Sequence, residues 1–211
     1  GYRTSSGRLF HGGYWRDEAE WPLARTQYTP YYLHFDGNLS PHLPTAESAH
    51  TTYRFDPSNP VPSIGGNVSS LAELGPMPPG ITNPALVPRS ARINQIMEPG
   101  GFDQTEAPKF YGCHPPYLPL GSRPDILVFQ TVPLEEPMEL TGPIEVILWV
   151  SSSTPDTDFT AKLIDLYPPS PAYPHGYALN LTDSIMRLRY HNGFDQGKLL
   201  PPGTITQLNI T

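Results

Sequence analysis

Ser151, Ser152 and Ser153 form the first group of residues in this 211-residue chain whose types could do chemistry. A serine hydrolase of the α/β type needs the spacing Gly-x-Ser-x-Gly, because only a tight turn from strand to helix leaves the serine oxygen exposed to substrate. The chain contains no such spacing. The serine run follows a strand-like segment, where hydroxyl groups ordinarily bond the backbone of a turn. We therefore assign it no catalytic role.

Cys113 stands next to His114, an arrangement that could suggest a thiol nucleophile beside its base. Adjacent side chains on extended backbone point in opposite directions, so these two would not pair with each other. A lone cysteine is more often simply buried. We interpret Cys113 as a structural thiol, and as the only cysteine it can form no intrachain disulfide.

Asp156 and Asp158 lie two residues apart, so on a strand both would face the same way and could share Ca²⁺ with a loop carbonyl. Two carboxylates are too few for the roughly six to eight oxygens that calcium takes. Capping of turns or bonds to backbone N–H groups is the favoured interpretation. The seven histidines show no His-x-x-x-His or His-Glu-x-x-His spacing. The sequence predicts no metal and no cofactor.

Aromatic residues near the start of the chain offer the most serious binding hypothesis: they are Trp15, Trp21, Tyr28, Tyr31 and Tyr32. β-Sandwich modules can hold sugars on exposed aromatic faces. The same side chains can equally fill a core or an interface between domains, because aromatic residues bury well. We favour the second interpretation and select Trp15, Trp21 and Tyr31 as candidate interface residues.

The elements that must position these residues are short strands joined by rigid turns. The chain has 28 prolines and 18 glycines, together about 22% of its residues and below the level of about 25–30% typical of disorder. Period-2 alternation and short apolar runs predict strands. The predicted strands cover residues 31–35 (closed by a turn at Asp36-Gly37-Asn38), 53–55 (stopped by Asp56-Pro57), 126–129, 138–141, 144–150, 158–163, 186–190 and 206–210.

Alternation also predicts which side chains face the core. Ile144, Val146, Leu148 and Val150 share one face; Phe159, Ala161 and Leu163 point inward, and Asp158, Thr160 and Lys162 point outward. No helical pattern is long enough for a crossover, so an antiparallel sandwich is expected. Residues 57–120 are predicted to be mostly loop, with two helical turns near Ser70–Leu74 and Ser90–Met97. Such a long loop is usually functional or packed against a neighbour.

Charge and hydropathy exclude several classes of partner. The net charge is −7 and no Lys/Arg cluster stands out, so no nucleic-acid partner is expected. No apolar run approaches the ~20 residues of a membrane span, so no membrane partner is expected either. The first residues of the chain show no pattern of charged, apolar and cleavage-site segments, so a signal peptide is not expected here. We expect a soluble protein, with the cytoplasm slightly favoured over secretion.

A set of short motifs lies in a fixed order over nearly the whole chain. The longest runs from Leu140-Thr141-Gly142-Pro143 through Ser151-Ser152-Ser153-Thr154-Pro155-Asp156 to Leu163. The others are Trp21-Pro22, Tyr31-Tyr32-Leu33, Phe55-Asp56-Pro57, Pro60-Val61-Pro62-Ser63-Ile64-Gly65-Gly66, Phe102-Asp103-Gln104, Arg123-Pro124-Asp125-Ile126-Leu127-Val128-Phe129, Asn180-Leu181-Thr182-Asp183 and Arg187-Leu188-Arg189-Tyr190. Together they resemble the C-terminal, non-catalytic domain of the X-Pro dipeptidyl-peptidase and cocaine esterase family of serine hydrolases.

The resemblance implies a jelly-roll β-sandwich, similar to galactose-binding domains, packed on an α/β-hydrolase domain of the same parent chain. The Ser, Asp and His triad would belong to that hydrolase domain, so this chain alone is expected to be inactive. Asp103 and Gln104 join the candidate binding or interface residues on the strength of their motif. Residues 1–211 would be one sandwich domain of a larger hydrolase, without the N-terminal hydrolase domain and the last C-terminal strands.

Two further expectations follow from this resemblance. An uncovered strand edge or interface invites pairing with another chain, so self-association is possible. The alternative function is a free-standing jelly-roll module that binds carbohydrate, which an exposed coplanar pair of aromatic rings would favour.

Overall fold

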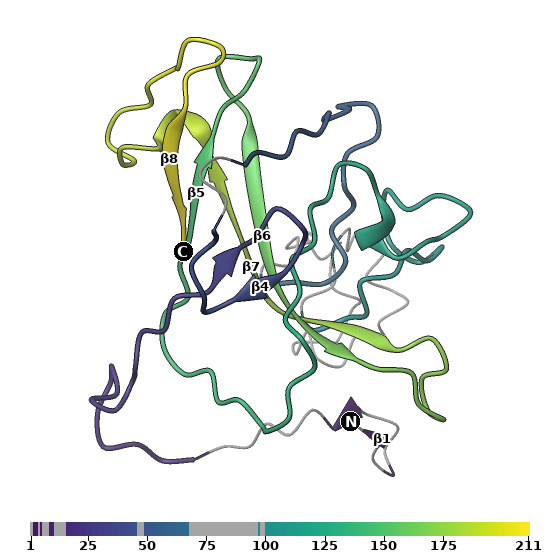
Figure 1. Ribbon diagram of the computed structural model, residues 1–211. Helices are drawn as coiled ribbons and strands as arrows, with labels where there is room; N and C mark the ends of the chain where they lie inside the picture. The colour runs from purple at the N-terminus through teal and green to yellow at the C-terminus, as the bar shows by residue number, and fades with distance from the viewer. Residues whose placement is uncertain are drawn as a thin grey trace, which may run out of the picture.

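A computed structural model describes residues 2–3, 5, 9–10, 16–45, 49–67, 97 and 100–211. The regular elements of this described part are short strands and two 3-10 turns, without an α-helix, which confirms the all-β class (Figure 1). Trp15, the predicted helical turn at 70–74 and all of the one at 90–97 except Met97 lie outside the described residues.

No helix within the described ranges is long and apolar enough to cross a lipid bilayer.

The strands pair as antiparallel ladders. The pairs are β1 (Tyr2–Arg3) with β2 (Leu9–Phe10), β3 (Tyr32–Leu33) with β4 (Leu39–Ser40), β5 (Val146–Val150) with β8 (Thr206–Ile210), and β6 (Asp158–Tyr167) with β7 (Tyr177–Arg187). The 3-10 turns are η3 (Leu120–Ser122) and η4 (Leu188–Tyr190).

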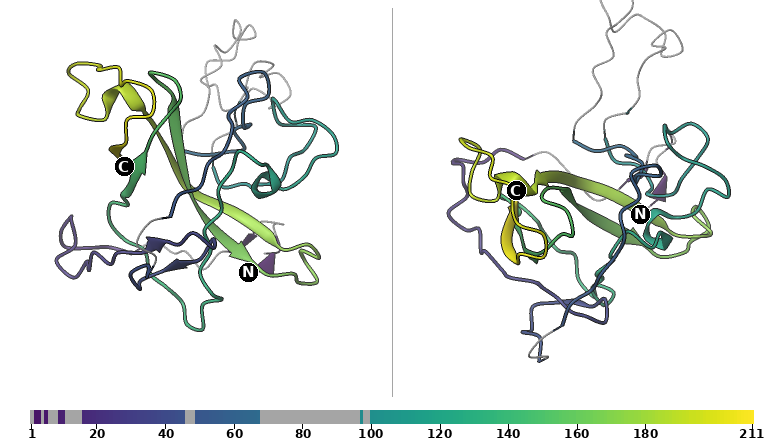
Figure 2. Two further views of the ribbon diagram at one scale, coloured as in Figure 1. Left: turned by 45° about the horizontal axis from the view of Figure 1, so that its top comes forward. Right: turned by 90° about the horizontal axis from the view of Figure 1, so that it is seen from above.

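The hydrophobic core lies between the β5–β8 ladder and one end of the β6–β7 ladder (Figure 2). Leu208 and Ile210 of β8 are fully buried, and Leu188 and Leu200 complete the buried centre. The partly buried residues that pack against this centre are Val146, Leu148, Val150, Phe159, Ala161 and Met186. Two ladders that face each other across one core are the layered arrangement that alternating strands predict.

Alternation places β5 and β8 as expected. Val146, Leu148 and Val150 face the core, whereas Ile147 and Trp149 are exposed on the other side of the ladder. Ile144, which we expected to share this face, lies before the strand, is 43% exposed and is not part of the core cluster. The predicted strand over residues 206–210 is confirmed, and β5 pairs with it along its whole length.

The predicted register of β6 holds at its start and changes at its middle. Phe159 and Ala161 contact the core, but a register shift between Leu163 and Ile164 interrupts the alternation. Leu163 is half-buried and is not part of the core cluster. Lys162 is not a free outward side chain, because it is itself half-buried and its Nζ lies 3.5 Å from Oδ2 of Asp183. An extra residue in one strand of a pair has this effect on side-chain direction.

The predicted strand over residues 186–190 ends early, at Arg187. Leu188 donates its N–H to the carbonyl of Thr157 and enters the core, and then η4 begins. The N–H of His191 bonds the carbonyl of Leu188, which closes a tight turn where we expected continued alternation.

The strand predicted over residues 31–35 is shorter than expected, since β3 covers only Tyr32–Leu33. The Asp36-Gly37-Asn38 turn connects β3 and β4, and Gly37 has φ of +84°, a conformation that glycine adopts at little cost. His34 and Asn38 close the turn through a 2.9 Å backbone bond.

Three predicted strands are wrong: 126–129, 138–141 and 53–55. Leu127 and Val128 are 41% and 52% exposed, and the described residues provide no strand beside them. Tyr53 and Phe55 are 38% and 53% exposed and belong to no ladder. An apolar run indicates that its side chains favour burial, but a strand also needs an adjacent strand with which its backbone can form hydrogen bonds. The stop after residue 55 is nevertheless correct, since Asp56 accepts the N–H of Ser58 in a turn.

Candidate functional site

The candidate interface residues fall into two separate regions. Trp21 and Tyr31 lie on an exposed N-terminal segment and are 68% and 38% exposed. Asp103 and Gln104 lie instead in a buried junction against β7. The first region can meet a partner, whereas the second holds the domain together.

We call residues 64–67, 100–104 and 178–183 the Gln104 junction. Gln104 is 6% exposed, and its Nε2 donates to the carbonyls of Ile64 at 2.8 Å and Phe102 at 3.1 Å. Asp103 accepts the N–H of Ala178 on β7 at 2.9 Å. Both side chains therefore bind backbone within the chain, and their role at an interface stays a prediction.

Glycines allow the segments of the junction to approach closely. Gly66 and Gly100 exchange two backbone hydrogen bonds of 2.9 and 3.0 Å. A Cβ on Gly66, whose φ is +124°, would lie 2.5 Å from Oδ2 of Asp183. The same carboxylate accepts the N–H of Asn67 at 2.9 Å, so Asp183 fixes the chain immediately after the glycine pair.

Two amide side chains in the junction have unpaired polar atoms. Oε1 of Gln104 and both side-chain polar atoms of Asn180 are buried and have no hydrogen-bond partner among the described residues. Because the two partners of Nε2 are carbonyl oxygens, which can only accept, the orientation of the Gln104 amide is fixed with Oε1 pointing away from them. The carboxylates of the junction, Asp103 and Asp183, are bound to backbone N–H groups, so we assign the junction a structural role.

The exposed region consists of two extended segments, residues 16–40 and 126–142, which we call the paired segments (Figure 1). They are joined at several points along their length. Gln130 bonds Gly37 at 2.8 Å and Leu39 at 2.9 Å through the backbone. Farther along, Oγ1 of Thr26 donates to the carbonyl of Thr141 at 3.3 Å.

A cluster of charges fixes the far end of the paired segments. Arg16 bonds both Glu18 and Glu139, and Arg25 bonds Glu18, with an Nη1–Oε2 distance of 2.9 Å. The hydrogen bond from Arg25 lowers the pKa of Glu18 to about 2, and the bond from Arg16 does the same for Glu139. These exposed pairs add little stability each, but they set the geometry of the segments.

The paired segments expose many large apolar side chains. Their exposed fractions range from 38% at Tyr31 to 75% at Val132. The exposed residues are Trp21, Tyr28, Tyr31, Leu33, Phe35, Leu127, Val128, Val132, Leu134, Met138 and Leu140. Isolated apolar residues on a surface are ordinary, but a concentration of them marks an interaction site.

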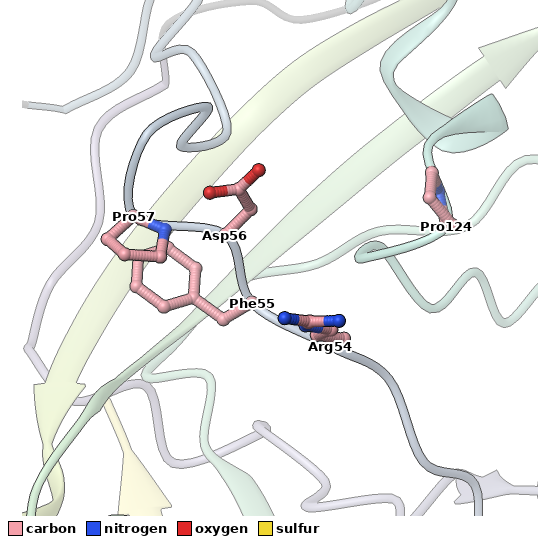
Figure 3. A pocket seen from close by; sticks show the side chains of 5 residues that line it. All are labelled: Arg54, Phe55, Asp56, Pro57 and Pro124. Carbon is pink, nitrogen blue, oxygen red and sulfur yellow. The ribbon is translucent and has the colours of Figure 1, made fainter.

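A shallow hollow of about 470 Å³ lies beside Arg54, Phe55, Asp56, Pro57 and Pro124 (Figure 3). Asp56 is the only carboxylate in its lining, and its hydrogen bonds from Ser58 lower its pKa. A carboxylate with a lowered pKa is a weak base, so the hollow does not support acid–base chemistry.

Arg123 connects the two segments that line this hollow, residues 54–57 and Pro124, through hydrogen bonds to residues that follow each of them. Its Nη2 donates to the carbonyl of Asn59 at 2.7 Å, and its Nε and Nη2 both bond Asp125 at 2.8 Å. The hydrogen bonds from Arg123 lower the pKa of Asp125. A bidentate pair of this kind is specific in geometry as well as favourable in energy.

The three groups that could have done chemistry all have structural contacts. Ser152 bonds the N–H and the hydroxyl of Thr154 in a turn. Burial raises the pKa of the Cys113 thiol, the opposite of an activated nucleophile.

The acidic pair is divided between two arginines. Asp158 forms a two-pronged bond with Arg187, at 2.8 and 2.9 Å. Asp156 accepts the N–H and the side chain of Arg189; burial opposes ionisation there, but these bonds outweigh it and lower the pKa of Asp156. The predicted bond to a backbone N–H group is thus confirmed for Asp156, whereas Asp158 is bound by the side chain of Arg187 and caps no turn.

The aromatic pairs of the described part are tilted or edge-on. The interplanar angles are 85° for Phe102 with Phe110, 58° for Tyr173 with Tyr177, and 38° for Tyr190 with Phe194. None of these pairs forms the coplanar platform that we expected of a carbohydrate site.

Sequence reasoning did not identify the junction, nor Asn180 and Asp183 as its members. A signal was available in the two glycine doublets, Gly65-Gly66 and Gly100-Gly101, which often mark close backbone approaches. Nothing local indicates that the two doublets would meet.

Comparison with known proteins gives consistent results. Residues 3–211 match the family described as the X-Pro dipeptidyl-peptidase C-terminal non-catalytic domain. Cocaine esterase from Rhodococcus sp. (strain MB1 Bresler) is 35% identical over 214 residues, covering 96% of this chain and 30% of the esterase.

Two solved structures are also similar. An aminopeptidase from a marine sediment archaeon, Thaumarchaeota archaeon, has a TM-score of 0.63 and 27% identity, covering 99% of this chain and 28% of the aminopeptidase. An α-amino acid ester hydrolase has a TM-score of 0.57 and 29% identity, covering 86% of this chain and 25% of the hydrolase. The chain thus spans less than a third of the length of each of these relatives.

Proposed function

Because the chain belongs to the family of X-Pro dipeptidyl-peptidase C-terminal non-catalytic domains, we propose that it packs on the α/β-hydrolase domain of a larger acyl hydrolase and helps to shape its substrate cleft. The hydrolase domain would supply the nucleophile, and this domain would supply surface. The parent would cleave an ester or an X-Pro peptide bond.

The observation that carries this proposal is the match itself, which covers residues 3–211 of this chain and less than a third of each relative. All of these relatives are named as hydrolases, so the remaining part of each is the natural place for the catalytic machinery. The contacts of Ser152, Cys113, Asp156 and Asp158 agree with a domain whose polar groups serve its own fold.

We also propose that residues 1–211 form one jelly-roll domain of the galactose-binding type. A jelly roll has two antiparallel sheets packed face to face, and the two antiparallel ladders on either side of a single core support this architecture. A crystal structure of the parent tests it directly, and a strand order without Greek-key connections would overturn it.

A photoreactive fluorophosphonate tests the functional proposal in the full-length parent. The serine oxygen displaces fluoride from the phosphorus of the probe, and irradiation then cross-links the photoreactive alkyl tail to nearby residues. We expect the attachment site outside residues 1–211 and cross-links from the tail into residues 1–211. Attachment to a serine of this chain would overturn the non-catalytic role. Attachment elsewhere without cross-links into this chain would overturn the cleft-shaping role.

A further inference from the structure

We propose that the paired segments, residues 16–40 and 126–142, are the face of this domain that docks on the catalytic domain of the same parent chain. The inference rests on the proposed function, and it adds which surface forms the contact. The occupant is an apolar face of the catalytic domain.

The first argument is a mismatch between sequence and exposure. The run Ile126-Leu127-Val128-Phe129 has the composition of a strand covered on both faces. In the structure Leu127 and Val128 are 41% and 52% exposed, and Val132 farther along is 75% exposed. Side chains selected for burial are thus uncovered here, which indicates that their cover lies outside the described residues.

The second argument concerns the backbone. From residue 126 to residue 142 the described structure has a single bridge, between Asn38 and Gln130, and no ladder. Backbone N–H and C=O groups that no strand pairs need water or a partner. An extended segment with apolar side chains and unpaired backbone is a poor solvent-exposed surface and a good docking surface.

The third argument is that the segments are held in place without burial. Backbone bonds at Gln130, the Thr26–Thr141 bond and the pairs of Glu139 with Arg16 and Arg25 fix one segment against the other. Leu23 is the anchor of the first segment, at 5% exposed. A surface that is fixed before contact loses little conformational entropy on docking.

The outer face of the β5–β8 ladder is the competing surface, and it fits solvent better. Ile147 and Trp149 are exposed there, but their cross-strand partners are Asn209 and Gln207. Asn209 also bonds Glu145 at 2.9 Å. Apolar and polar side chains alternate across this face, as on many sheets with one face in water.

The size of the relatives argues for the occupant. The chain covers 30% of the esterase and 28% and 25% of the two solved structures, so a parent of similar length would hold a much larger remainder. A contact between two domains of one chain does not need high affinity, because the linker keeps the effective concentration of each domain near the other high. The catalytic domain is thus the partner most readily available.

Hydroxyl-radical footprinting of the full-length parent tests the proposal with matched pairs of side chains. Within this structure Trp21 and Trp149 are 68% and 71% exposed, Tyr28 and Tyr111 are 71% and 73%, and Phe35 and Phe194 are 72% and 73%. The first member of each pair lies on the paired segments and the second lies elsewhere. We expect Trp21, Tyr28 and Phe35 to be oxidised several-fold more slowly than their partners, at a protein concentration where sedimentation shows a monomer.

Each other outcome overturns the inference. Slower oxidation of Trp149, Tyr111 and Phe194 would place the catalytic domain on another face and leave the proposed function standing. Equal oxidation rates within each pair would mean that the paired segments are not the docking face. If these equal rates also matched those of fully exposed side chains, they would contradict packing on a catalytic domain. Protection of Trp21, Tyr28 and Phe35 that disappears on dilution would identify the occupant as a second copy of the chain.

Discussion

The Cα of Gly65 faces the carbonyl oxygen of Gly100 so closely that a Cβ on Gly65 would overlap this oxygen. The same Cβ would lie 2.6 Å from Cδ2 of Phe102. Gly65 also has φ of +69°, where a side chain is strained in any case. Close packing and backbone conformation thus both require glycine at this position of the Gln104 junction.

Gly65→Ala should destabilise the domain by about 2–5 kcal/mol, as the sum of about 1–2 kcal/mol for a left-handed residue and about 1–3 kcal/mol for overpacking. Gly203→Ala is the matched control, because Gly203 has φ of +80° but nothing within 4 Å of its added Cβ. Urea unfolding of both variants measures the difference. Equal losses would mean that Gly100 and Phe102 move aside without cost.

Leu208→Ala should cost about 2–5 kcal/mol, because Leu208 is fully buried at the centre of the core and truncation leaves a cavity. Its neighbour Gln207 is exposed and its side chain bonds Asn209, also exposed, so Gln207→Ala should stay within about 0.5 kcal/mol. Thermal unfolding of the two variants checks the register of β8. A larger loss of stability for Gln207→Ala would mean that Gln207, and not Leu208, faces the core.

Arg123→Ala should destabilise the domain by about 1–3 kcal/mol, because it leaves the carboxylate of Asp125 without its charged partner. Arg123→Lys should recover only part of this loss, since a lysine cannot form the two-pronged bond. A double-mutant cycle with Asp125→Asn separates the pair from the Asn59 contact. Additive losses would show that the pair itself contributes nothing.

Sequence patterns predicted the strands whose apolar faces pack against each other in the core. They failed where burial depends on other parts of the molecule. β5 and β8 alternate against a core that they share, so periodicity alone identifies them. Residues 126–129 have the composition of a buried strand, but composition does not say what covers them. The Gln104 junction joins Ile64, Gln104 and Asn180 through long-range contacts, which no local pattern encodes. Its motif was recognised, but the contacts required the structure.

Carboxyl titrations of Glu18 and Glu139 should have midpoints near pH 2, well below the ordinary value near 4.5. Since their pKa values are lowered in the folded state, their contribution to stability is complete above about pH 4.5 and is lost as the pH falls toward 2. Carbon-detected NMR measures the midpoints. The variant Arg16→Gln with Arg25→Gln should raise both, and midpoints that do not respond would rule out the arginines as the cause.

Alkylation of Cys113 provides a final test of its structural role. Burial is the main cause of its raised thiol pKa, and the nearby charge of Glu106 raises the pKa further. Because the thiolate is the reactive form, iodoacetamide should react slowly at neutral pH and reach half of its maximal rate above the ordinary cysteine value of about 8.5. His114→Ala should leave this pH profile unchanged, since neighbouring side chains on extended backbone diverge. A maximal rate already reached near neutral pH, and lost in His114→Ala, would instead identify an activated cysteine–histidine pair.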